Sequence, residues 1–353
     1  MPASRFVYPR SPAVKISLFF ILLALVCLLF SDMAITTLHP WQETGRFALG
    51  LLTPDFSDYP AILSALWQTL AFALIGVSLG ALGGFLLAPV FEYRLVHTGC
   101  AVLRSVHELF WALIFLQFFG FHPLTGVLAI AIPFAAICAK VYAEIFEEVD
   151  ASPLHALPAG SGRISRFFYA RLPLAWAHIK TYTAYRLECG LRTSAVLGFI
   201  GLPTLGFYLE TFFKQGLYSE SAALLLVFYV LIASLRWWLR PRLLPLYLVV
   251  SAYLLFHDVV AIDFANVHRF FTEDIVPYPL RQADTFFSAI SGLSTWLKNL
   301  LVDQALYGAI ETLVLTQLAL VASGMLALLL FPLISHHFRS RFGARLGHAF
   351  LVI

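Results

Sequence analysis

The sequence is poor in charged residues, which make up only 12% of its 353 positions. A soluble domain averages about 25% charged residues, so the deficit argues against a soluble protein. The net charge of +3 at pH 7 is too small to indicate a nucleic-acid partner. The chain has 4 cysteines and no CxxC pair, so neither a disulfide framework nor a zinc site is expected.

Signatures of ATP binding and of metalloproteases are missing too. The sequence holds no G-x-x-x-x-G-K-[ST] loop, so the chain is not expected to bind ATP phosphates by that route, and it holds no HExxH. No nucleophile, metal set or acid–base pair at a telling spacing supports a third reading, a polytopic membrane enzyme. We therefore expect no cofactor on this chain.

Long apolar runs are abundant, and each spanning helix needs about 20 such residues. They predict an all-α polytopic membrane protein with eight complete spans, at about 13–30, 62–89, 101–121, 124–142, 181–201, 221–239, 243–261 and 307–334. We interpret the first run as a retained helix rather than a cleaved signal peptide, because no clear cleavage site follows it.

Arginine and lysine are distributed unevenly between the predicted loops. With the N-terminus in the cytoplasm, the segments predicted to lie inside carry most of the loop arginines and lysines. Positive charge gathers on the cytoplasmic side of membrane proteins. The pattern places 143–180 and 335–345 inside, and 31–60 and 262–300 outside.

An internal repeat is visible at a constant offset. The stretch "QTLAFALIGVSLGALGGFLLAPV" from Gln68 matches "ETLVLTQLALVASGMLALLLFPL" from Glu311, and the threonine, leucine and proline of each copy align. Parallel repeats of this kind are a common plan among transporters. We expect a first six-span repeat at 1–242 and the start of a second, incomplete repeat at 243–353.

One cytoplasmic segment stands out, "HALPAGSGRISRFFYARLPLA" at 155–175, with two short helices expected across the membrane face. Gly160 is followed by Leu172-Pro173, and Ala170 stands two positions before Leu172. This spacing resembles the coupling loop of ABC importer permeases: Glu-Ala-Ala, three residues, Gly, nine residues, Ile, one residue, Leu-Pro.

The front of that loop departs from the family pattern. Ala156 and Leu157 resemble its second and third residues, shifted by one position, and no glutamate precedes them. Pro158 disfavours a continuous helix there. The departure bears on the strength of coupling to an ATPase rather than on family membership.

A second stretch, "YRLECGLRTSAVLGFIG" at 185–201, resembles the fifth-span segment of phosphonate-type permeases. The resemblance covers roughly 50–235. It implies an inner-membrane permease subunit for phosphonate or a related phosphorus oxyanion. It also implies an ATPase dimer that holds ATP and Mg²⁺ and docks at 155–173, a periplasmic substrate-binding protein, and in some systems a second permease chain or half.

Charged residues inside two predicted spans are candidates for the substrate pathway, because a charge in a bilayer costs about 2.5–3.5 kcal/mol on insertion scales. Arg104 and Glu108, and likewise Glu188 and Arg192, are four positions apart, so each pair can share a helix face. Arg186 lies off the Glu188–Arg192 face with no local partner. A guanidinium suits phosphonate oxygens, so Arg186 is the leading candidate for anion contact.

An alternative from another class stays open at this point. An ion-coupled secondary transporter would use Glu108, Glu188 and His107 as a proton relay. The Gly to Leu-Pro segment distinguishes the two hypotheses, since only an ABC importer needs such an element facing an ATPase.

Overall fold

The computed structural model describes residues 12–31, 39–150, 162–257, 264–283 and 285–334, with single positions at 158, 160, 262, 343 and 347. Across these residues the chain is helical and holds no strand, so the all-α prediction is confirmed. The chain divides into two compact units, Trp41–Thr272 and Met1–Pro40 with Glu273–Ile353. The repeat boundary at 242 stays a prediction, because these units reflect spatial contacts and not sequence repeats.

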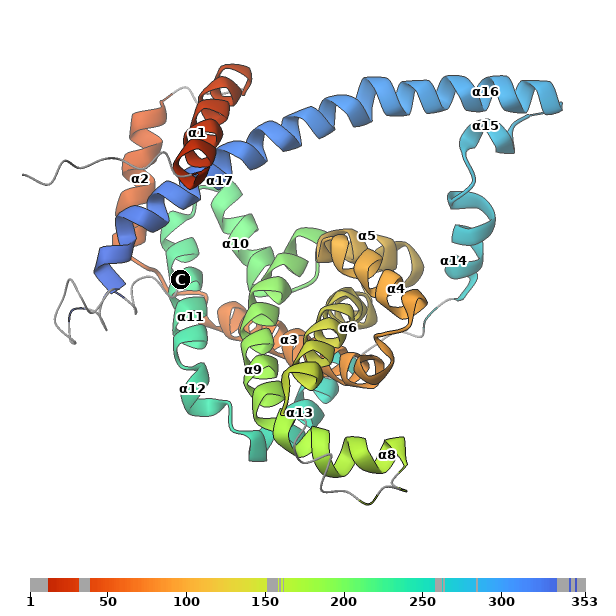
Figure 1. The fold of residues 1–353 in the computed structure, drawn as a ribbon. Coiled ribbons are helices and arrows are strands. Elements are labelled where there is room, and N and C mark those ends of the chain that lie inside the picture. Colours follow the sequence, from red (N-terminus) through yellow and green to blue (C-terminus); the bar gives the residue numbers. More distant parts are fainter. Residues whose placement is uncertain are drawn as a thin grey trace, which may run out of the picture. The chain divides into compact units, whose positions relative to one another are not determined.

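The larger unit is built around three packed helices, α3, α6 and α9 (Figure 1). Its helices are α2 (Pro40–Leu52), α3 (Tyr59–Leu87), α4 (Arg94–Ser105), α5 (Glu108–Phe119), α6 (Pro123–Glu148), α8 (Arg163–Arg166), α9 (Leu172–Val196), α10 (Leu205–Lys214), α11 (Tyr218–Ala233), α12 (Leu235–Trp238), α13 (Leu244–Phe256) and α14 (Phe264–Arg269). Short helical turns join them: η1 (Ala88–Val90), η2 (Phe167–Arg171), η3 (Leu197–Ile200), η4 (Pro241–Leu243) and, after α14, η5 (Phe270–Asp274).

The described helices include 3 that are long and apolar enough to cross a membrane, or up to 5 if each of two bent pairs is one span. Shorter apolar helices cover Val14–Phe30, Tyr218–Ala233 and Pro241–Phe256. Each of the eight predicted spans overlaps one of these helices or pairs. Because a membrane-spanning helix rises about 1.5 Å per residue, the 16-residue α11 is short for a bilayer core of about 30 Å.

Glycines on α3 bring α6 close to it. Gly76, Gly80 and Gly84 recur every four residues and form one stripe on α3. A β-carbon at Gly76 or at Gly80 would lie 2.8 Å from the β-carbon of Ile130 or of Phe134 on α6. Small residues let membrane helices approach closely, so this stripe fixes the central helix pair of the unit.

The predicted span at 101–121 is not one helix. It is divided into α4 and α5, which meet at an angle of 92°. Val106 is extended at the break, and the side chain of His107 accepts a hydrogen bond from the amide of Leu109 as the N-cap of α5. The apolar run therefore continues through a sharp bend between two helices, and hydropathy does not reveal this bend.

A second bend separates α9 from α10, at 53°. Gly201 ends η3 with φ of 89°, a conformation that favours glycine. Thr69 on α3 accepts a hydrogen bond from the amide of Leu205 at 2.8 Å, and its own hydroxyl donates to the carbonyl of Ala65. Buried Thr69 thus ties the start of α10 to the central helix.

The smaller unit contains a long helical run. Its helices are α1 (Pro12–Phe30), α15 (Tyr278–Arg281), α16 (Phe286–Lys298), the π-helical turn η6 (Asn299–Ala305) and α17 (Leu306–Ile334). α1 packs against α17, and the Gln317 side chain donates to the carbonyl of Phe20 at 3.0 Å. No residue from 306 to 333 is buried.

Candidate functional site

The segment that resembles a coupling loop leads directly into α9. α8 is followed by the π-helical turn η2 and then by α9, with Pro173 in the first turn of α9. Proline is tolerated there because the first-turn amides have no helical acceptor. In Figure 1, α8 turns away from the long axis of α9 at the lower end of the unit.

The structure places only part of the predicted coupling motif. Ala156 and Leu157 lie outside the described residues, so one of the two expected short helices is seen, as α8. Gly160 is an exposed turn residue, and a β-carbon there would have no heavy atom within 4 Å. Leu172 is half-buried in a cluster with Tyr142 and Phe146.

Aromatic rings join the coupling segment to the ends of two central helices. Phe167 of η2 packs edge-on against Phe146 of α6 with ring centroids 4.9 Å apart, and both rings lie next to Phe85 of α3. Ile164 and Tyr169 of the same segment are 75% and 79% exposed. The segment therefore has one face anchored in the unit and one exposed face.

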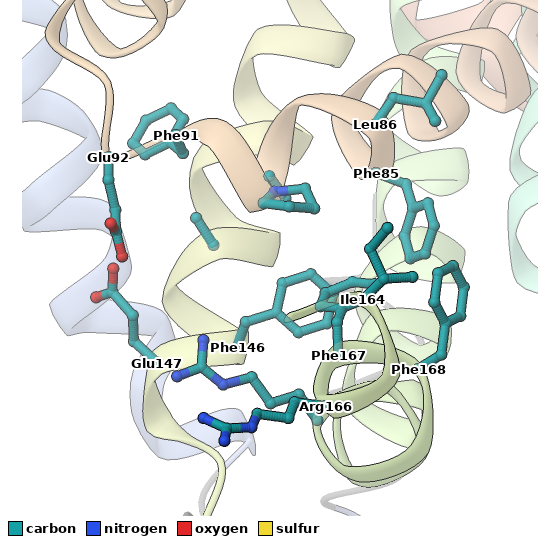
Figure 2. A pocket seen from close by; sticks show the side chains of 14 residues that line it. Phe85, Leu86, Phe91, Glu92, Phe146, Glu147, Ile164, Arg166, Phe167 and Phe168 are labelled. Atoms are coloured by element: carbon teal, nitrogen blue, oxygen red, sulfur yellow. The ribbon is translucent and has the colours of Figure 1, made fainter. Parts of the chain in front are cut away.

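A cavity of about 690 Å³ lies beside this aromatic cluster. The lining comes from the end of α3 with η1, the end of α6, and the α8–η2 segment. Figure 2 shows the carboxylates of Glu92 and Glu147 pointing toward one another, with the Arg166 side chain beside Glu147. The cavity thus combines an aromatic wall with charges of both signs.

Of the two charged pairs predicted to share a helix face, the structure confirms one and contradicts the other. Arg192 donates to Glu188 at 2.6 Å, which confirms that this pair shares a face of α9. Arg104 and Glu108 do not share a face, because Arg104 ends α4 and Glu108 begins α5 beyond the bend. Glu108 lies instead against His107, whose Nε2 is 3.5 Å from its carboxylate.

Arg186 has a local partner, so the prediction that it has none was wrong. Its Nε donates to the hydroxyl of Tyr182, one turn earlier on α9, at 2.7 Å. Its guanidinium carbon also lies 5.1 Å from the centroid of the Tyr182 ring. This partner is uncharged, and no carboxylate pairs with Arg186 among the described residues. The positive charge of Arg186 is therefore not neutralised.

Sequence reasoning missed the hydroxyl of Tyr182, which binds Arg186, and two further hydroxyls beside Tyr182. Besides Tyr182, the hydroxyls of Tyr142 on α6 and Thr183 on α9 lie 2.6 Å apart. Thr183 donates its only proton to the carbonyl of Ile179, so Tyr142 is the donor between them. The four-residue spacing of Tyr182 and Arg186 could have been read from the sequence, whereas Tyr142 comes from another helix.

Other chemical signals do not form sites in the described residues. Gly76-Val77-Ser78-Leu79-Gly80 fits the G-x-S-x-G pattern of hydrolases, but it lies inside α3. That pattern needs a sharp strand-to-helix turn to expose its serine. The described part of the chain also holds no group of three or more His, Cys, Asp or Glu residues that could bind a metal ion.

The chain is similar to named permease proteins of bacteria. It is 30% identical over 204 residues to the phosphite transport system permease protein PtxC of Stutzerimonas stutzeri, covering 55% of this chain and 74% of PtxC. It is 32% identical over 170 residues to HtxC of the same organism, which is named as a permease protein of a phosphite transport system. This match covers 45% of this chain and 60% of HtxC. It is 29% identical over 219 residues to the phosphate-import permease protein PhnE of Mycolicibacterium smegmatis, covering 58% and 41%.

The matched segment spans less than two thirds of the length of HtxC and of PhnE. No family model matches the chain. Among solved structures, a chain described as an amino acid ABC transporter with histidines aligns with a TM-score of 0.46 and 21% identity, covering 56% of this chain and 98% of that one.

Proposed function

Because the chain belongs to the permease family of phosphite, phosphonate and phosphate ABC import systems, we propose that it carries a phosphorus oxyanion across the inner membrane. Permeases of this family are multi-pass proteins of the inner membrane and do not hydrolyse ATP themselves. In this proposal, an ATPase dimer that holds ATP and Mg²⁺ drives transport by hydrolysing ATP. A periplasmic binding protein delivers the substrate. A second permease chain or half completes the pathway.

The coupling segment carries the ATPase part of this proposal. Its buried face, Phe167 and Leu172, packs on helices α3 and α6, while its other face presents exposed Ile164 and Tyr169. A push on the exposed face is transmitted into α9 without a break, because α8, η2 and α9 are continuous. The 155–173 segment is thus suited to pass ATPase closure to the pathway.

The arginine and lysine bias of the loops supports an N-terminus in the cytoplasm. This orientation puts the 155–173 segment on the side where ATP is available. It also favours the ATP-driven mechanism over the ion-coupled alternative, which gives the segment no role.

Arg186 carries the oxyanion part of the proposal. Its charge is not paired with a carboxylate, and a guanidinium binds the oxygens of phosphorus acids through charge-assisted hydrogen bonds. A single such contact is weak enough for the substrate to leave again. Arg104, Glu108, Glu188 and Arg192 also remain proposed residues of the substrate pathway.

A matched pair of variants tests the docking of the ATPase. Tyr169→Asp places a charge on the exposed face of the coupling segment, and Tyr93→Asp places the same charge on another exposed residue predicted to be cytoplasmic, 65% exposed. The tagged permease is purified with its ATPase subunit, and the ATP hydrolysis that co-purifies is measured. We expect Tyr169→Asp to lose most of it and Tyr93→Asp to retain it. Equal retention by both variants would refute docking at this segment.

A further inference from the structure

The guanidinium of Arg186 lies among aromatic rings. Its central carbon is 5.1 Å from the ring centroid of Tyr182, 5.6 Å from that of Tyr185 and 5.9 Å from that of Phe134. Phe134 belongs to α6 and is fully buried, whereas both tyrosines are on α9. Rings at these distances attract a cation through their π faces, and they form an apolar wall beside the charge.

Three hydrogen-bond donor groups remain available at this wall. Arg186 uses Nε for Tyr182, and its two terminal amines have no acceptor among the described residues. The hydroxyl of Tyr182 accepts from Arg186, and its own proton is donated to no group in the described chain. Tyr142 and Thr183 are committed to each other and to Ile179, so they do not compete for a ligand.

The site is accessible from one face of α9. Tyr182, Tyr185, Arg186 and Cys189 follow the spacing of one helix face, and each is half-buried or exposed. A charge directed at lipid is costly, so this face is suited to a protein interface or to a water-filled pathway. The nearest acidic residue on α9, Glu188, is paired with Arg192, which leaves the site positive.

The combination of donors and wall selects among phosphorus oxyanions. Two or three oxygens of the ligand can accept from Arg186 and Tyr182, but the ring faces of Tyr185 and Phe134 offer no donor to a further oxygen. A polar oxygen pressed against an apolar wall loses its hydrogen bonds to water without replacement. A hydrogen or carbon substituent on phosphorus loses nothing there.

We propose that Arg186, Tyr182, Tyr185 and Phe134 form an oxyanion subsite that prefers phosphorus acids bearing an apolar substituent, such as phosphite or an alkylphosphonate, over phosphate. This inference rests on the proposed function. It assigns part of the substrate selection to the permease itself, in addition to any selection by a binding protein.

The experiment compares uptake of radiolabelled phosphite with uptake of phosphate, normalised to inserted permease. The same binding protein and ATPase are present in every strain, so a change in the ratio arises in the permease. Tyr185 is 54% exposed, so Tyr185→Gln replaces part of the wall with a polar group at little risk to folding. Tyr253→Gln, at a 65% exposed tyrosine of α13, is the matched control.

We expect Tyr185→Gln to lower the phosphite-to-phosphate ratio by roughly three- to ten-fold and Tyr253→Gln to leave it unchanged. Tyr182→Phe removes a donor without changing the wall, so it should raise the KM for both anions and leave the ratio unchanged. Methylphosphonate should compete with phosphate better in the wild type than in Tyr185→Gln.

The outcomes separate this inference from the proposed function. If the wild type takes up a phosphorus oxyanion but the ratio is the same in Tyr185→Gln, the subsite is overturned and the transport function stands. If wild-type cells take up neither phosphite, methylphosphonate nor phosphate, both proposals are wrong.

Discussion

Helices α3 and α17 have matching sequences and opposite environments. Both have 29 residues, and Thr69, Leu70 and Pro89 align with Thr312, Leu313 and Pro332 at one constant offset. Each threonine hydroxyl donates to the carbonyl four residues earlier, at 2.7 Å. Yet 44% of the most apolar window of α3 is buried within the protein, against 0% in the helix that contains α17.

The difference lies in small residues rather than in hydropathy. Gly80 and Gly84, which bring α6 close to α3, align with Ser323 and Ala327 in α17. Each of these replacements adds a β-carbon, which in α3 would be too close to α6 at the distance seen between these two helices. Apolar length determines that a helix enters the membrane, whereas the glycine stripe determines what packs against it.

The largest expected effect concerns the direction of the two helices. If they are parallel repeats, cysteines placed before each helix react from the same side of the membrane. We expect Asp58→Cys and Gln282→Cys to be labelled by an impermeant maleimide from the periplasmic side, and Tyr93→Cys only after the cells are opened. The native chain serves as the labelling background. If the cysteines at positions 58 and 282 were labelled from opposite sides of the membrane, the two helices would not be parallel repeats.

The next effect tests the glycine stripe. A β-carbon at Gly84 would overlap the β-carbon of Cys138 and lie 2.8 Å from the amide nitrogen of Ala139. Gly84→Leu should therefore destabilise the larger unit by about 1–3 kcal/mol or more. Ala327→Leu, at the aligned and exposed position of α17, should change stability by about 0.5 kcal/mol or less.

The thermal unfolding midpoint in detergent measures both variants, together with the amount inserted in the membrane. Equal losses for Gly84→Leu and Ala327→Leu would mean that α17 is packed as closely as α3.

A smaller effect isolates one hydrogen bond. Thr69→Val keeps the shape of the side chain and removes the acceptor for the buried amide of Leu205. An orphaned buried amide costs about 1–3 kcal/mol. The aligned Thr312→Val removes only a bond to the carbonyl of Gly308 on an exposed face, so a change within about 0.5 kcal/mol is expected. Midpoints that fall equally would show that Thr312 also has a distant partner.

The sequence reveals those parts of the fold that follow from local pattern. Uncharged runs locate α3, α6 and α17, and four-residue spacing correctly pairs Glu188 with Arg192. The same spacing is wrong for Arg104 and Glu108, because extended Val106 breaks the helix between them. An apolar run has the same composition on both sides of such a bend, so hydropathy does not detect it.

The candidate site was likewise only partly predictable from the sequence. Arg186 was identified from its charge in a span, and Tyr182 precedes it by one turn of the same helix. Phe134 reaches the guanidinium from α6, and only close packing of α6 and α9 brings it there. Gly190 also lets α9 approach α3, since a β-carbon at that position would overlap the side chain of Val77 on α3. Long-range contacts of this kind require the folded chain.

The smallest effect concerns Gln317, where α17 makes a polar contact with another helix, whereas the aligned residue of α3 is the fully buried Leu74. Gln317→Leu makes α17 more like α3 and removes its bond to the carbonyl of Phe20. Hydrogen bonds between membrane helices average about 0.6 kcal/mol, which corresponds to roughly a three-fold change in an equilibrium. We expect hydrogen–deuterium exchange of the amides in α1 to become about three-fold faster, with exchange in α6 unchanged as the internal control. An acceleration of ten-fold or more would contradict this expectation, because Gln317 would then hold α1 to α17 as firmly as Thr69 holds α10 to α3.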